Sequence, residues 1–320
     1  MRPGRGSRPR TRRRPAHESA AEGFVAGVDR GRYRCLVEDR MVTAMRAREL
    51  GRRGVVIGDR VALAGDVSGA PGTLARVVRV YPRSTVLRRS ADDTDPVERV
   101  IVANAHQLVI VSALADPPPR PRLIDRFLVA AYDAGLVPVL CLTKADLASP
   151  TELLAVYRPL GIAYVITGRP LTRAGLDPLG DLLAGQVSVL VGHSGVGKST
   201  LVNALIPDAE RAVGTVSPVT GRGRHTSSSA VALPLPGGGW LIDTPGLRSF
   251  GLGHLAPDRV VRAFPDLAGG ILACPPGCSH NEPDCALDDW VRDQGGDARL
   301  VARLDSLRRL LRSQEGAEAA

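Results

Sequence analysis

The stretch "GHSGVGKST", Gly192–Thr200, decides how the rest of the chain is interpreted. Gly192, Gly197, Lys198 and Ser199 fit the phosphate-loop pattern G-x-x-x-x-G-K-[ST]. The apolar run "VSVLV" precedes it and "STLVNALI" follows with helical spacing, which is the strand–loop–helix context that the pattern requires. Glycines let successive backbone N–H groups point at phosphate oxygens, while the lysine reaches the phosphates and the serine hydroxyl binds Mg²⁺. The stretch therefore predicts a nucleotide site on a parallel α/β sheet.

The position of the base-reading motif follows from the lysines. The chain has only two, Lys144 and Lys198, among 42 basic residues. Guanine presents two adjacent donors that one carboxylate can accept together, and GTPases carry that carboxylate in Asn/Thr-Lys-x-Asp at the end of a strand. No such motif can follow Lys198. "TKAD", Thr143–Asp146, ends the apolar run "VPVLCL", so the base motif precedes the phosphate loop.

Two further segments complete the predicted nucleotide site. "WLIDTPG" places Asp243 at the end of an apolar strand, where it can hold Mg²⁺, and Gly246 where its N–H can meet the γ-phosphate. "GRGRHTSSS" lies between the phosphate loop and this strand, and its Thr226 is the candidate for a second magnesium hydroxyl beside Ser199. The order is base motif, phosphate loop, switch and Asp-Thr-Pro-Gly. That order predicts a GTPase domain whose elements are circularly permuted.

Composition and pattern divide the chain into four parts. Residues 1–22 form an Arg-rich arm, and 23–98 show the short alternating strands of a small OB-type β-barrel. Residues 99–252 alternate buried strands with helices and form the permuted α/β GTPase domain, with "RVIVA" as one strand of its parallel sheet. Residues 253–320 contain a Cys/His cluster, and then Leu300, Leu304, Leu307 and Leu311 at helical spacing.

The net charge of +9 is unevenly distributed along the chain. The first 100 residues hold 22 arginines and 12 acidic residues, and seven of these arginines fall in "MRPGRGSRPRTRRR" with no acidic residue among them. This charge predicts a polyanionic partner, and RNA is favoured over the alternative of a solvated tail that only aids solubility. The apolar runs are too short to span a bilayer and no apolar core follows the arginines, so we expect a cytoplasmic protein with no membrane partner.

The cysteine and histidine cluster predicts a zinc site. Cys274, Cys278, His280 and Cys285 have the spacing C-x3-C-x-H-x4-C. In a cytoplasmic protein, three thiolates and an imidazole form a closed tetrahedral zinc site, and so short a segment needs the metal to hold its shape. The other cysteines, Cys35 and Cys141, lie in apolar strands and are expected in the core.

These motifs together resemble the bacterial RsgA (YjeQ) family of small-ribosomal-subunit-dependent GTPases. The resemblance runs from about residue 24 to residue 310, and it is carried by "NAHQLVIVSAL", "LIDRFLVAA", "TKADL", "GHSGVGKSTLVNAL", "GRGRHT", "DTPGLRSFGL" and "CSHNEPDCAL". It implies an OB-type barrel, a permuted GTPase domain and a C-terminal zinc domain. It further implies a factor for late maturation of the 30S subunit that binds rRNA, with slow GTP hydrolysis that the subunit stimulates. We expect a monomer.

The resemblance also bears on single residues. Leu247 fills the position of the water-orienting Gln of ordinary small GTPases, and by resemblance His225 of "GRGRHT" takes over that role. Thr143 stands in place of the more usual Asn, which removes an amide able to tie loops together, while Asp146 preserves the preference for guanine. The residues expected to contact GTP or GDP are Thr143, Lys144, Ala145, Asp146, Gly192, His193, Ser194, Gly195, Val196, Gly197, Lys198, Ser199, Thr200, Asp243 and Gly246.

Two alternatives stay open at this point. The chain could be a nucleotide-dependent RNA-binding protein in which turnover is incidental, since Leu247 has no polar atom to orient water. It could also be a related permuted GTPase that serves the large subunit. The barrel ahead of the domain and the metal cluster behind it favour the small subunit.

Overall fold

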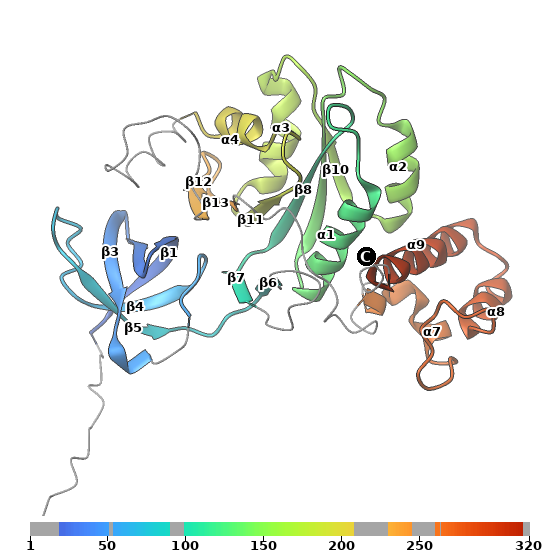
Figure 1. Ribbon diagram of the computed structural model, residues 1–320, viewed down its shortest axis with the longest axis horizontal. Coiled ribbons are helices and arrows are strands. Elements are labelled where there is room, and N and C mark those ends of the chain that lie inside the picture. The colour runs from blue at the N-terminus through green and yellow to red at the C-terminus, as the bar shows by residue number, and fades with distance from the viewer. Residues whose placement is uncertain are drawn as a thin grey trace, which may run out of the picture.

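The chain folds into a barrel, a central sheet flanked by helices, and a helical C-terminal region (Figure 1). The computed structural model describes residues 19–50, 54–89, 99–207, 230–244, 260–262 and 264–315. The Arg-rich stretch at residues 1–18 lies outside this part of the chain. None of the helices described is long and apolar enough to cross a membrane.

Five strands form the barrel: β1 (Ala21–Asp29), β2 (Arg32–Val37), β3 (Arg40–Arg46), β4 (Arg60–Gly65) and β5 (Ala75–Val80). The short 3₁₀ helix η1 (Arg48–Leu50) follows β3. Strand β1 pairs with both β2 and β4, and β5 pairs with both β3 and β4, so the sheet closes on itself. Alternate side chains point inward and fill the barrel, as expected for a period of two. The predicted barrel is confirmed, and Cys35 lies in its core.

A separate hairpin follows the barrel. Strand β6 (Val86–Arg89) pairs antiparallel with β7 (Arg99–Ala103), and the two form a sheet of their own. Strand β7 is the "RVIVA" segment, so the prediction that it joins the parallel sheet is wrong. Apolar composition identifies a strand with buried side chains but does not specify which strand it pairs with.

The central sheet contains five parallel strands in the order β10-β9-β8-β11-β13, and antiparallel β12 lies between β13 and strand β1 of the barrel. Strands β8 (Gln107–Ala113), β9 (Val137–Thr143) and β10 (Ala163–Ile166) come first in the chain. Strands β11 (Gln186–Val191), β12 (Val231–Pro234) and β13 (Gly239–Asp243) follow. The carboxyl ends of β9, β11 and β13, which precede the predicted motifs, therefore lie at one edge of the sheet.

Helices cover both faces of this sheet. Helices α1 (Pro121–Asp133) and α2 (Thr151–Tyr157), followed by the 3₁₀ helix η2 (Arg158–Leu160), pack on one face. Helices α3 (Arg173–Leu183) and α4 (Lys198–Leu205) pack on the other face. Strand β8 is apolar on both faces, which is why helices cover both. Its Leu108 and Ile110 pack in the core beneath α1 and α2, while Val109 and Val111 pack in the core beneath α3 and α4.

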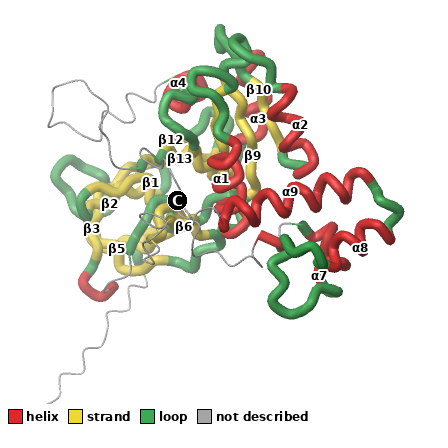
Figure 2. Tube along the Cα trace, turned by 45° about the vertical axis from the view of Figure 1, so that its right-hand side comes forward, coloured by secondary structure: helices red, strands yellow, loops and turns green. Residues whose placement is uncertain are grey.

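The C-terminal region consists of η3 (Pro265–Leu267), α7 (Ala268–Ile271), α8 (Ala286–Asp293) and α9 (Ala298–Glu315). Figures 1 and 2 show α9 beside α1, and these helices are in contact. Leu304, Leu307 and Leu311 are buried against the core that α1 lines, and Leu300 is partly buried there. The amphipathic helix predicted from these leucines is confirmed.

Candidate functional site

The phosphate loop connects β11 to α4 through three glycines with left-handed φ values. Gly192 has φ 149°, Gly195 82° and Gly197 97°. A Cβ atom on Gly192 would lie 2.3 Å from the carbonyl oxygen of Val111, so only glycine fits between β11 and β8. Lys198 begins α4, and its Nζ donates to the carbonyl oxygens of Gly192 at 2.5 Å and His193 at 2.7 Å. The loop therefore has the curled backbone that phosphate binding requires.

The base motif is hydrogen-bonded directly to this loop. Thr143, 5% exposed at the end of β9, donates its hydroxyl to the carbonyl oxygen of Val196 at 2.6 Å. Thr143 lacks the amide of the more usual Asn, and its hydroxyl connects the two loops instead. Lys144 follows with a left-handed φ of 60°, and its Nζ donates to the carbonyl oxygen of Asp116.

A third loop, which the sequence analysis did not single out, lies beside Asp146. The carboxylate oxygen Oδ1 of Asp146 accepts the backbone N–H of Arg169 at 2.8 Å, and the N–H of Ala145 donates to Thr167 at 3.1 Å. A Cβ atom on Gly168 would lie 3.1 Å from the nitrogen of Asp146. The loop after β10 lines a hollow next to this carboxylate. The signal in the sequence was the Thr-Gly pair that ends the apolar run "AYVITG".

Asp243 ends β13 at the same edge of the sheet. It lies opposite Leu190 of β11 on one side and Val231 of β12 on the other. Burial raises the pKa of its carboxyl group, and the charge of Lys198 partly opposes that rise. The hydroxyl of Thr244 donates to the carbonyl oxygen of Leu190 at 3.2 Å, which fixes the chain as it leaves the strand. A cation bound beside the phosphate loop would favour the ionised carboxylate.

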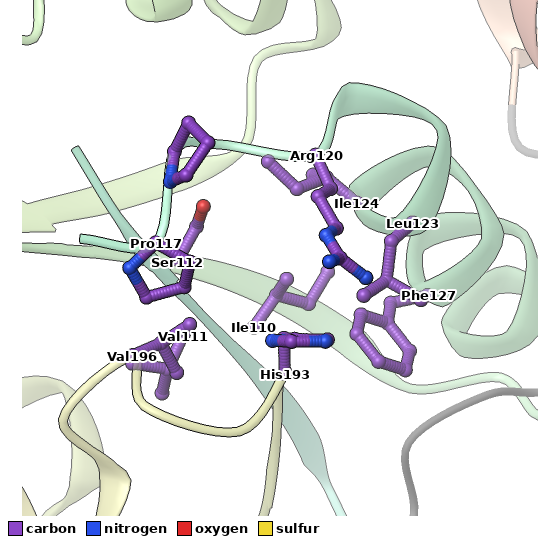
Figure 3. A pocket seen from close by; sticks show the side chains of 11 residues that line it. Ile110, Val111, Ser112, Pro117, Arg120, Leu123, Ile124, Phe127, His193 and Val196 are labelled. Carbon is purple, nitrogen blue, oxygen red and sulfur yellow. The ribbon is translucent and has the colours of Figure 1, made fainter. Parts of the chain in front are cut away.

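The phosphate loop also faces helix α1. Figure 3 shows His193 and Val196 of the loop on one side of a small pocket, with Arg120, Ile124 and Phe127 on the other. The Nδ1 atom of His193 lies 2.8 Å from the carbonyl oxygen of Ser194. The start of α1 and the loop that precedes it therefore pack against the phosphate loop.

The four predicted metal ligands converge in the C-terminal region. The ligand atoms of Cys274, Cys278, His280 and Cys285 lie within 4.8 Å of one another. The Sγ of Cys274 is 3.7 Å from that of Cys285, and the Nδ1 of His280 is 3.5 Å from the first sulfur and 3.8 Å from the second. Tetrahedral bonds to zinc give about 3.8 Å between sulfurs and about 3.6 Å between sulfur and nitrogen. These residues can hold a metal ion.

The family model described as "RsgA GTPase" matches residues 80–253, more than half of the chain. The chain belongs to the RsgA GTPase family. It is therefore a GTPase, a hydrolase that acts on GTP. This chain is an RsgA-family GTPase with a barrel ahead of its catalytic domain and a candidate metal site behind it.

Relatives resemble this RsgA-family chain over most of its length. A Chromohalobacter salexigens protein described as "Small ribosomal subunit biogenesis GTPase RsgA" is 42% identical over 267 residues, 81% of this chain and 75% of the relative. The Pseudomonas aeruginosa protein of the same description is 41% identical over 246 residues, 74% of this chain and 70% of the relative.

Two crystal structures share the fold. YloQ, described as a circularly permuted GTPase, has a TM-score of 0.65 at 23% identity, and covers 95% of this chain and 98% of its own. YjeQ from Thermotoga maritima has a TM-score of 0.62 at 24% identity, with 91% and 98% covered. At this identity the likeness concerns the fold alone, and it agrees with the permuted order predicted from the motifs.

Three predicted site residues of the RsgA-family chain lie outside the described residues. His225 and Thr226 fall in 208–229, and Gly246 falls in 245–259 together with Leu247. The other residues expected around the nucleotide belong to the phosphate loop, the base motif and the end of β13.

Proposed function

We propose that this chain couples GTP binding and hydrolysis to late maturation of the 30S ribosomal subunit. The observation that carries the proposal is the hydrogen bond from Thr143 to Val196, which joins the base motif to the phosphate loop and so supports a single nucleotide site served by both lysines. Two of the relatives are described as small ribosomal subunit biogenesis GTPases. Their description supports the 30S subunit, rather than the large subunit, as the partner.

The nucleotide site would work by positioning and charge. Asp146 would accept the two guanine donors, and the loop N–H groups with Lys198 would hold the phosphates. Ser199, Thr226 and Asp243 would hold Mg²⁺, which neutralises charge on the phosphates when bound. By resemblance to the family, His225 would orient the attacking water, a role that the apolar side chain of Leu247 cannot fill.

The cysteine cluster would hold a structural zinc ion. The distances between the ligand atoms of the cluster agree with those expected for tetrahedral zinc, which supports this proposal. A bound zinc ion would supply a rigid crosslink rather than chemistry, because these four side chains would fill all of its tetrahedral positions. This region would dock on the subunit.

The barrel and the N-terminal arm would bind rRNA through its phosphates and shape. Exposed arginines occur on several barrel strands, including Arg32, Arg40 and Arg76. Aromatic stacking has little support, since Tyr33 is buried in the barrel and Phe24 stacks on Trp240. We expect binding that weakens steeply with salt.

The decisive experiment measures GTP hydrolysis by the full chain alone, with 30S subunits and with large subunits. We expect 30S subunits to stimulate hydrolysis and large subunits to leave it unchanged. Stimulation by large subunits would favour the related large-subunit function, and no stimulation by either would favour an RNA-binding protein with incidental turnover. A His225→Ala variant in the same assay is expected to lose most of the stimulated rate. An unchanged rate would remove His225 from the mechanism.

Nucleotide state would control docking and release. The full chain is expected to act as a cytoplasmic monomer and to bind 30S subunits more tightly with a GTP analogue than with GDP. Equal affinities would refute the coupling, because a ligand shifts an equilibrium only by its differential binding to the two states.

A further inference from the structure

Helix α9 carries three arginines that reach three separate partners. Arg303 forms a fork with Asp266 at 2.7 and 2.9 Å and also donates to the carbonyl oxygen of Leu160 at 2.9 Å. Arg309 pairs with Asp125 of α1 at 3.2 Å. Arg308, next to Arg309 in sequence, reaches toward the four candidate metal ligands instead. The proposed function gives no role to this side chain.

Arg308 uses all three of its guanidinium nitrogens. Nη1 and Nη2 donate to the two carboxylate oxygens of Asp288, at 2.8 and 2.6 Å. Nε donates to the backbone carbonyl oxygen of His280 at 3.0 Å. The side chain is 18% exposed, so these contacts are shielded from water. One side chain thus connects α9 to the His280 backbone and to the first turn of α8, which begins immediately after Cys285.

The backbone of His280 is in a conformation that needs support. Its φ is 64°, in the left-handed region that residues other than glycine adopt at a cost, and the residue is 6% exposed. This conformation directs the imidazole toward the sulfurs of Cys274 and Cys285. A hydrogen bond on the carbonyl of the same residue fixes the peptide plane and hence the direction of the ring.

We propose that Arg308 is a positioning residue of the metal site, holding the ligand His280 in its left-handed conformation and balancing the charge of the cluster. The inference rests on the proposed zinc site. Three thiolates and one neutral imidazole around Zn²⁺ carry a net charge of about −1, so a permanent cation beside them is favourable.

The geometry requires arginine rather than lysine. The two parallel bonds to Asp288 occupy one edge of the planar guanidinium, and Nε remains free to meet His280. An ammonium is a single point of donation on a flexible stem, and it cannot reproduce both contacts in fixed directions. Lysine at this position would preserve the charge and lose the alignment.

The test is a zinc-affinity measurement on the full chain by competition with a chromophoric chelator. We expect Arg308→Ala to bind zinc about 10–100-fold more weakly, the range found when outer partners of metal ligands are removed. Arg308→Lys should recover only part of this loss. Arg312→Ala is the matched control, because Arg312 lies one turn further along α9 with an exposed side chain, and its affinity should equal that of the unaltered chain.

Cobalt(II) substitution gives a second measurement, which would not change if Arg308 only stabilised the packing of α9. The visible absorption of bound cobalt should shift in Arg308→Ala, because the imidazole direction changes, and should not shift in Arg309→Ala, which loosens α9 at its contact with α1. Equal losses of zinc affinity in Arg308→Ala and Arg309→Ala would overturn the inference. An unchanged zinc affinity in Arg308→Ala would overturn it too. If the unaltered chain takes up no zinc, the proposed metal site itself fails, and the inference fails with it.

Discussion

The barrel joins the central sheet through backbone pairing and apolar contacts, whereas the C-terminal region (264–315) joins it through arginine side chains as well as leucines. At the barrel junction, Gly27 of β1 pairs with Val231 of β12, and the ring of Phe24 stacks on Trp240 with centroids 4.9 Å apart. At the C-terminal junction, Arg309 pairs with Asp125 and lies over the ring of Tyr157, 5.1 Å from its centroid. The two junctions therefore contact different sides of the nucleotide site.

The barrel junction lies next to the predicted magnesium ligand. Gly27, Val231 and Asp243 are directly opposite one another across three neighbouring strands. Two strand spacings separate the outer pair, about 10 Å. A bulge between Val25 and Gly27 lets β1 change its pairing partner. Before the bulge β1 pairs with β4 of the barrel, and after it β1 pairs with β12 of the central sheet. A shift of β12 or β13 would reach the barrel through the backbone itself.

The C-terminal junction instead contacts α1. The start of this helix faces the phosphate loop at His193, and its next turn holds Arg309 through Asp125. Charged side chains can separate and reform without breaking a sheet, so this attachment is suited to a region that changes position. The contrast predicts that each junction can be weakened alone.

The largest effect on local stability should come from removing a candidate metal ligand. Cys285 is 2% exposed, and Cys285→Ser should abolish stoichiometric zinc binding and speed amide hydrogen exchange in α8 and α9 at least tenfold, since such sites fold with their metal. Hydrogen exchange by mass spectrometry checks this, and the barrel strands should be unchanged. Cys141→Ala, at a buried cysteine outside the cluster, is the control and should retain one zinc. Faster exchange in the barrel would show that the two junctions are not independent.

The next effect concerns the buried ion pair. Arg309→Met leaves Asp125, whose side chain is 3% exposed, without its cation and should cost about 3 kcal/mol in the free energy of unfolding at pH 7. Burial raises the pKa of Asp125, and Arg309 opposes that rise, so the variant raises this pKa further. A carboxyl group with a raised folded-state pKa destabilises the protein as pH rises through that value.

The deficit of Arg309→Met should therefore grow between pH 4 and pH 8 in urea titrations. An Asp125→Asn/Arg309→Met double variant removes the titrating group and should show no such growth. A deficit independent of pH in the single variant would mean that Asp125 does not ionise differently in the folded state.

A smaller effect is expected at the barrel junction. Phe24→Ala removes the stack on Trp240 and should cost about 1–2 kcal/mol, since the ring is only partly buried. The chain has two tryptophans, so a Trp290→Phe background isolates the emission of Trp240. The emission should shift to longer wavelength in Phe24→Ala, while zinc content stays at that of the parent. An unshifted spectrum would mean that the stack does not shield the indole.

The parts of the candidate site that are formed by residues close in sequence could be predicted from the sequence. The junctions of the barrel and of the C-terminal region with the central sheet could not. The phosphate loop and the metal cluster are fixed by residues close in sequence, and the lysine count alone indicated "TKAD" as the base motif. The partner of "RVIVA" and the antiparallel strand β12 depend on tertiary pairing, which apolar runs do not encode. The ion pairs of the α9 arginines could not be predicted either, because their acidic partners lie at distant positions in the sequence, such as Asp125 and Asp266.

The smallest effect should leave both junctions intact and alter the nucleotide site alone. Thr143→Val keeps the branched shape but leaves the buried carbonyl of Val196 without its donor, at a cost of about 1 kcal/mol. A loss of that size in nucleotide affinity is about fivefold weaker binding of GDP and GTP, which calorimetry measures. Thr143→Ser retains the hydroxyl and should bind nearly as well as the unaltered chain. Equal affinity in the valine variant would mean that Thr143 does not align the phosphate loop with the base motif, and that each loop is held in place by its own strand.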